Sequence, residues 1–150
     1  MCRVPFFAVL VSLLNRTAVQ ASEAIVTDAG KRLTASLAFI SQADPGTAPS
    51  CNHITKAILR FYCGLGTLGV ISCSSVISRL QEFVGKATEL VTGDSNDAAD
   101  AKQAYGDMLV EAVLLALPWG GKALFEQEQD ASESLLQRIH DYMSSRPKKV

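Results

Sequence analysis

Apolar side chains that recur every three or four residues constrain the fold of this chain more than any other feature of its sequence. The clearest case lies in residues 74–91, where apolar positions follow the i, i+3, i+4, i+7 spacing of one helix face. The positions are Val76, Ile77, Leu80, Phe83, Val84, Ala87, Leu90 and Val91. No segment shows the sustained two-residue alternation of a strand, so the sequence predicts an all-α protein.

Similar stripes, separated by turn-forming residues, predict six helices. Their approximate ranges are 5–14, 18–41, 52–65, 74–91, 99–117 and 130–146, with a possible short turn of helix in residues 122–129. The first is apolar on nearly every side, which predicts a helix that is buried over most of its surface.

Local signals at the helix ends support this division. Asn52 is a favourable N-cap, and Pro118 cannot continue a helical hydrogen-bond ladder. Three glycines, Gly64, Gly66 and Gly69, are expected to end the third helix. Asp130 and Glu133 have the spacing of a capping box at the start of the sixth helix.

The helices group into pairs whose starts lie about 47 residues apart, at the upper end of the range for HEAT-type repeats. The pairs occupy residues 5–41, 52–91 and 99–146. We therefore expect residues 1–150 to form a single helical-repeat domain of stacked antiparallel helix hairpins. This is a HEAT-like α-solenoid with an armadillo-type superhelix, in which each pair covers the apolar face of the next.

The charge balance argues against direct binding of nucleic acid. Fourteen Lys and Arg residues stand against 15 Asp and Glu residues, which gives a net charge of −1 and no surplus to neutralise phosphates. The basic cluster in residues 146–149 is either a fragment of a nuclear-import signal or a solvated chain end, and we favour the latter. The chain also lacks the long apolar run of a membrane span, so we expect no membrane partner.

Patterns that would carry chemistry lack their required context. Residues 64–69 match the glycine spacing of dinucleotide-binding loops, but no strand precedes them. Cys51, His53, Cys63 and Cys73 do not form the close ligand pairs of a structural zinc site. We expect no catalytic residue, no metal, no cofactor and no small-molecule substrate. We also expect reduced, buried thiols, and His140 in a structural role.

The N-terminus leaves one alternative open. An apolar run over residues 4–14 and small residues before Ala21 imitate a secretory signal sequence. Under that interpretation, the chain is a small secreted helical protein that is disulfide-bonded after signal cleavage near Ala21. Under the other, the run is a first helix with Pro5 in its first turn.

The most individual stretch, AVLLALPWGGKALFE in residues 112–126, is an apolar helix followed by a proline stop, an aromatic residue and two glycines. We expect it to fold Trp119 back against the core. The stretch is similar to the Leu-Pro-Trp-x-Gly-Lys-x-Leu signature of the large subunit of the nuclear mRNA cap-binding complex. Its first domain is of the type found in the middle of initiation factor 4G. The matching residues, which we treat as a structural signature, are Leu117, Pro118, Trp119, Gly121, Lys122, Leu124 and Glu126. Segments 5–15, 59–61, 82–84 and 139–146 resemble the same family in the same order.

This resemblance implies a non-enzymatic scaffold domain, incomplete relative to the family because the later helical domains are absent from this sequence. It implies a nuclear location and a role in mRNA processing, export and decay. The implied partner is the small RNA-recognition subunit, which grips the cap, so that this chain would contact capped RNA only indirectly.

Overall fold

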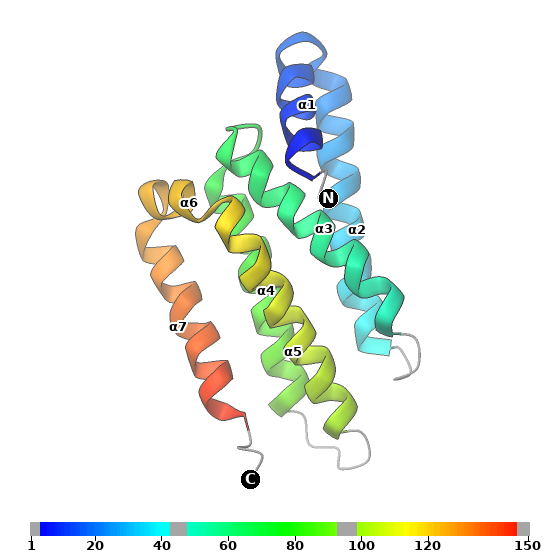
Figure 1. The fold of residues 1–150 in the computed structure, drawn as a ribbon, viewed down its shortest axis with the longest axis vertical. Coiled ribbons are helices and arrows are strands. Elements are labelled where there is room, and N and C mark those ends of the chain that lie inside the picture. Colours follow the sequence, from blue (N-terminus) through cyan, green and yellow to red (C-terminus); the bar gives the residue numbers. More distant parts are fainter. Residues whose placement is uncertain (1–3, 43–47, 93–98, 147–150) are drawn as a thin grey trace.

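A computed structural model describes residues 4–42, 48–92 and 99–146, and the regular structure within these ranges is entirely helical (Figure 1). The elements are α1 (Val4–Thr17), α2 (Val19–Gln42), α3 (Ala48–Thr67), α4 (Cys73–Thr92), α5 (Ala99–Ala116), the 3-10 turn η3 (Leu117–Trp119), α6 (Gly121–Gln127) and α7 (Gln129–Ser145). The prediction of an all-α protein is confirmed.

The helices form two layers. In one layer, α3 packs between α1 and α5. In the other, α2 packs on α1 and α3, α4 packs most extensively on α5, and α7 lies on α4 (Figure 1). The HEAT-like solenoid and its division into three repeats stay predictions, because these contacts describe the order of helices without fixing a repeat unit.

The core is centred on the interface between α4 and α5. Phe83 and Val84 of α4 and Leu109 and Val113 of α5 are completely buried. Burial of such side chains stabilises the fold by about 1.5–3 kcal/mol each. The stripe predicted for residues 74–91 is confirmed, with its first six positions buried and Leu90 and Val91 partly buried against the same cluster.

Two predicted helix ends are wrong. Helix α3 begins at Ala48 rather than near Asn52, and it continues through Gly64 and Gly66. Only Gly69 leaves the helical region, with a φ of 74° that favours glycine. Tertiary contacts thus override two glycines whose local preference is to end a helix.

The predicted capping box is also wrong. Glu128 occupies the N-cap position of α7 and its side chain makes no capping hydrogen bond. Glu133 instead accepts a hydrogen bond of 2.9 Å from the Gln129 side chain. Helix α7 starts one residue earlier than predicted because it follows α6 directly. Glu128 is both the C-cap of α6 and the N-cap of α7.

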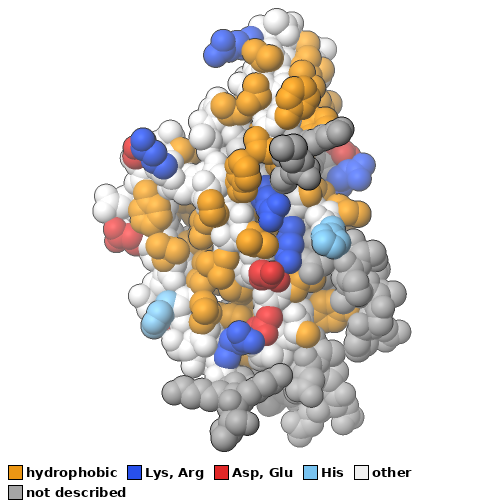
Figure 2. All heavy atoms as spheres, in the orientation of Figure 1, with side chains coloured by type: hydrophobic (Ala, Val, Ile, Leu, Met, Phe, Trp, Pro, Cys, Tyr) orange, Lys and Arg blue, Asp and Glu red, His pale blue; other side chains and the backbone are white. Residues whose placement is uncertain are grey.

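Helix α1 differs most from its prediction. Only Ala8 and Val11 are buried, whereas Phe6, Val9 and Leu13 are 66%, 47% and 55% exposed. The reason is its place at one end of the layer, where α1 packs mainly on α2 and α3. Figure 2 shows apolar side chains gathered over this end of the molecule.

Exposed apolar positions occur on other helices as well. Leu115 on α5 and Leu136 and Met143 on α7 belong to predicted stripes but are 38%, 41% and 53% exposed. Among the described helices, no single one is long and apolar enough to span a membrane. One pair of helices is together long and apolar enough to do so, by length and composition alone. It consists of Lys102–Trp119 and Gly121–Gln127, which are bent by 80° relative to each other.

Candidate functional site at residues 117–126

Residues 117–126, which we call the signature corner, turn the chain sharply between α5 and α6. Helix α5 ends at Ala116, and Pro118, which cannot continue the α-helical ladder, is the second residue of η3. The Gly120 N–H then donates to the Leu117 carbonyl oxygen at 3.1 Å, and the Leu124 N–H donates to the Gly120 carbonyl oxygen at 3.0 Å. These two bonds let a bend of 80° occur without leaving those backbone groups unpaired.

The signature corner is anchored on the C-terminal part of α3. The Thr67 hydroxyl donates to the Trp119 carbonyl oxygen at 2.8 Å, and it also lies 3.2 Å from the Cys63 carbonyl oxygen within its own helix. Gly120 lies so close that an added Cβ would be 3.2 Å from both the Cβ and the carbonyl oxygen of Cys63. The turn therefore rests backbone to backbone on α3.

Gly120 is the glycine that this close approach requires. It stands at the first unspecified position, x, of the Leu-Pro-Trp-x-Gly-Lys-x-Leu signature. A Cβ added at Gly121 would have no neighbour within 4 Å. In the sequence, the adjacent glycines are the only local indication of a close approach here. They do not indicate which of the two faces another helix.

The signature side chains divide into one buried anchor and several exposed groups. Leu124 is 2% exposed and joins the main core. Lys122 and Glu126 point into solvent, with Nζ and Oε1 3.9 Å apart. Trp119 is 39% exposed, so the expected fold-back against the core is wrong for its side chain, although its carbonyl is anchored.

Two buried thiols lie beside the signature corner. Burial raises the pKa of Cys63 to about 12, and burial followed by the charge of Glu128 raises the pKa of Cys73. The Cys73 Sγ lies 3.8 Å from the Ala123 carbonyl oxygen, as a weak donor. The prediction of free, buried thiols is confirmed at these two positions, while Cys2 and Cys51 lie outside the residues whose side chains are described.

The glycine-rich stretch of residues 64–69 serves helix packing. A Cβ at Gly64 would lie 3.1 Å from the Ala8 Cβ on α1, and one at Gly66 would lie 2.7 Å from the Val76 Cγ2 on α4. Both glycines thus bring neighbouring helices close to α3. In the part of the chain that is described, no group of three or more His, Cys, Asp or Glu residues is placed to hold a metal ion.

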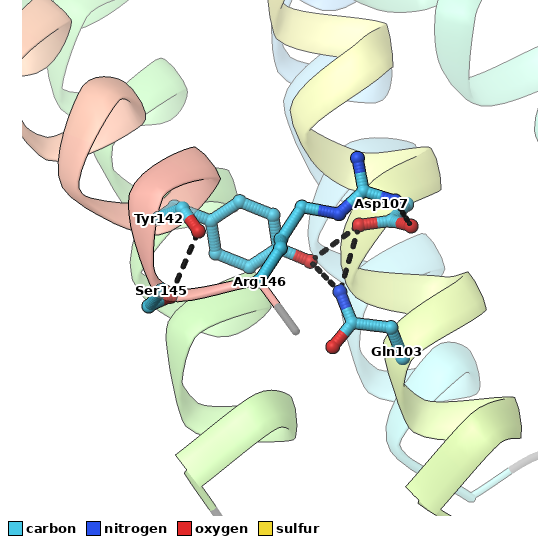
Figure 3. A network of polar contacts seen from close by, with 5 residues as sticks. All are labelled: Gln103, Asp107, Tyr142, Ser145 and Arg146. Atoms are coloured by element: carbon cyan, nitrogen blue, oxygen red, sulfur yellow. Dashed lines mark hydrogen bonds and ion pairs between the residues drawn. The ribbon is translucent and has the colours of Figure 1, made fainter. Parts of the chain in front are cut away.

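A second polar cluster joins α5 to the end of α7 (Figure 3). The Tyr142 hydroxyl and the Gln103 amide both donate to Asp107 Oδ1 at 3.0 Å, and Arg146 Nη2 donates to Asp107 Oδ2 at 2.6 Å. Burial, followed by the hydrogen bond to Asp107, raises the pKa of Tyr142. The sequence gives no sign of this cluster, because its bonded partners lie up to 39 residues apart.

Two predictions near the C-terminus are corrected or limited by the structure. The His140 side chain is 74% exposed and lies 3.8 Å from the Asp141 carboxylate, so its expected structural role is wrong. In the basic cluster of residues 146–149, Arg146 is engaged by Asp107, while the following residues lie outside the described ranges.

No family model matches the chain. Among curated proteins, "Nuclear cap-binding protein subunit 1" of Oryza sativa subsp. japonica is 30% identical over 144 residues, or 96% of this chain and 15% of the rice protein. "Nuclear cap-binding protein subunit 1-B" of Xenopus laevis and "Nuclear cap-binding protein subunit 1" of Xenopus tropicalis are each 33% identical over 91 residues. Those matches cover 61% of this chain and 10% of each frog protein.

The chain thus spans about 15% of the length of the rice relative. The similarity extends far beyond the signature corner and confirms the resemblance that the corner indicated. Over nearly its whole length, this chain is homologous to one segment of proteins named nuclear cap-binding protein subunit 1.

Proposed function

We propose that this chain is a non-enzymatic helical scaffold domain that acts in a nuclear cap-binding complex. The observation that carries the proposal is the 30% identity to the rice subunit over 96% of the chain. The near-neutral charge supports a surface that binds protein rather than a phosphate backbone.

The finer proposal is that the chain supports a small RNA-recognition subunit, which itself binds the capped end of mRNA during processing, export and decay. A scaffold needs rigid elements that present partly exposed side chains. The signature corner has this character, because Leu124 and Gly120 fix it on α3 while Trp119 and Phe125 remain 39% and 38% exposed. Exposed Trp side chains on a rigid support are frequent anchors at protein interfaces.

Affinity purification of the tagged chain from nuclear extract tests this proposal. We expect the small RNA-recognition subunit to co-purify, and capped RNA to be retained only when that subunit is present. A Trp119→Ala variant should retain less of the small subunit, whereas Leu136→Ala, at an exposed apolar position on α7, should retain the same amount.

Mass spectrometry of the native protein distinguishes the scaffold proposal from the secretion alternative. If the chain is a nuclear scaffold, we expect an uncleaved N-terminus and free thiols at Cys63 and Cys73. A chain cleaved near Ala21 and carrying a disulfide, with no small subunit in the purified fraction, would contradict the proposed function.

A further inference from the structure

An open groove runs between α2 and α4, which both pack on α3 but hardly touch each other. Its main hollow has a volume of about 1010 Å³, with Tyr62 of α3 among its lining residues and Arg138 of α7 at one side. A second hollow of about 560 Å³ continues it along α2. The two share Thr34, Ala38, Tyr62 and Arg79, so we treat them as one α2–α4 groove.

Four cationic side chains from three helices line the α2–α4 groove: Lys31, Arg79, Lys86 and Arg138. Two of them already have carboxylate partners, since Arg79 lies 3.1 Å from Glu82 and Lys86 lies 3.2 Å from Glu89. Lys31 and Arg138 make no ion pair with any described residue. Among the described residues, the groove therefore carries two positive charges without a carboxylate partner.

The arginine side chains lie close to the backbones of neighbouring helices, and Arg79 lies closest, beside Gly30. A Cβ at Gly30 of α2 would be 3.2 Å from Arg79 Nη2, and a Cβ at Gly85 of α4 would be 3.4 Å from Arg138 Nη2. Arg79 also donates to the Thr34 hydroxyl across the groove at 3.0 Å. Held in this way, the Arg79 guanidinium group loses less conformational entropy when it binds a ligand.

We propose that the α2–α4 groove binds an acidic segment of a partner protein. Carboxylates on such a segment complement Lys31 and Arg138, and the hydroxyl of Ser78 at the groove margin offers a further donor. Partial burial of Arg79 and Lys86, 27% and 29% exposed, strengthens their attraction for a negative ligand relative to fully solvated cations.

The same groove disfavours a nucleic acid. Glu82 and Glu89 lie along it and repel an unbroken row of phosphates, whereas a peptide can place its acidic residues away from them. The proposal stands apart from the proposed function, because it uses residues of α2, α4 and α7 and none of the signature corner.

Titration of the isotope-labelled chain, followed by amide NMR shifts, tests the proposal with three probes. The probes are a synthetic glutamate-rich peptide, a lysine-rich peptide of the same length and a single-stranded oligouridylate. We expect only the glutamate-rich peptide to shift amides, and the shifted amides to lie along the α2–α4 groove. A glutamate-rich peptide that shifts nothing, or an oligouridylate that shifts the same amides, would overturn it.

A pair of charge-reversal variants sharpens the result. The double variant Lys31→Glu, Arg138→Glu replaces two attractive charges by two repulsive ones and should weaken peptide binding roughly tenfold at low salt. The control Arg16→Glu, Lys122→Glu makes the same change in net charge at exposed sites outside the groove and should leave the affinity unchanged. Equal loss in both variants would show unspecific attraction and contradict the proposal. All four side chains are exposed, so circular dichroism should confirm that both variants fold.

Discussion

Gly106 of α5 sets how closely the end of α7 approaches. A Cβ there would overlap the Tyr142 hydroxyl and lie 3.3 Å from both the Ala87 carbonyl oxygen and Val91 Cγ2. The missing side chain therefore makes room for the hydrogen bond from Tyr142 to Asp107.

Gly106→Ala should lower the free energy of unfolding by about 1–3 kcal/mol, as other overpacked core substitutions do. The gain in helix propensity, up to about 1 kcal/mol, offsets only part of this loss. Urea denaturation measures the change. Gly121→Ala is the matched control, since its Cβ meets no neighbour within 4 Å and should leave stability unchanged or slightly higher. Equal effects at the two positions would show that Tyr142 is not held where the structure places it.

Cys63 should make the stability of the chain fall in alkaline solution. Its pKa is raised from an ordinary 9.0 to about 12 by burial, so the unfolded chain releases this proton at lower pH than the folded chain does. Its contribution is therefore complete below about pH 9 and is lost as the pH rises towards 12. Denaturation at a series of pH values should show this fall, and Cys63→Ala should make it shallower. An unchanged slope in the variant would contradict the burial of the thiol.

Among the elements, the signature corner is anchored to α3 by the hydrogen bond from the Thr67 hydroxyl. Thr67→Val removes the donor to the Trp119 carbonyl and should cost about 1 kcal/mol of stability. Because Trp119 is the only tryptophan in the chain, its fluorescence should shift to longer wavelength as the corner loosens.

Thr88→Val serves as the control for that change. The Thr88 hydroxyl bonds only the Val84 carbonyl oxygen of its own helix, at 3.0 Å, so the variant should leave the emission of Trp119 unaltered. The same spectral shift in both variants would mean that Thr67 does not hold the corner.

Comparison of α4 with α1 shows what a helical stripe predicts. Both helices carry apolar residues at helical spacing, and both form where expected. Helix α4 packs on α5, α7, α3 and α6, so its stripe is covered, whereas α1 packs mainly on α2 and α3. Periodicity identifies the residues that share a face, and the number of neighbouring elements decides whether that face is buried.

At the scale of the whole molecule, the core is unevenly distributed. The main cluster extends from α2 to α7, whereas α1 contributes Ala8 and Val11 to a small second cluster with Leu65. Local opening is easiest where few apolar contacts must be broken.

Amide hydrogen exchange should therefore be fastest in α1 and slowest in the buried parts of α4 and α5. Mass spectrometry of peptic fragments resolves these segments. Protection of α1 equal to that of α4 would show that the exposed face of α1 is covered in solution, most simply by another molecule.

The sequence by itself determined the helical class, the buried stripe of α4, the break at Pro118 and the relation to the cap-binding subunit. These depend on residue spacing and on a motif contained within a few turns of chain. Only the tertiary structure decided that Gly120 rather than Gly121 contacts α3 and that Trp119 stays partly exposed. It also decided that Asp107 accepts hydrogen bonds from both Tyr142 and Arg146. Each of those outcomes depends on which distant segments meet, and a pattern of neighbouring residues holds no information about the atoms packed against it from another helix.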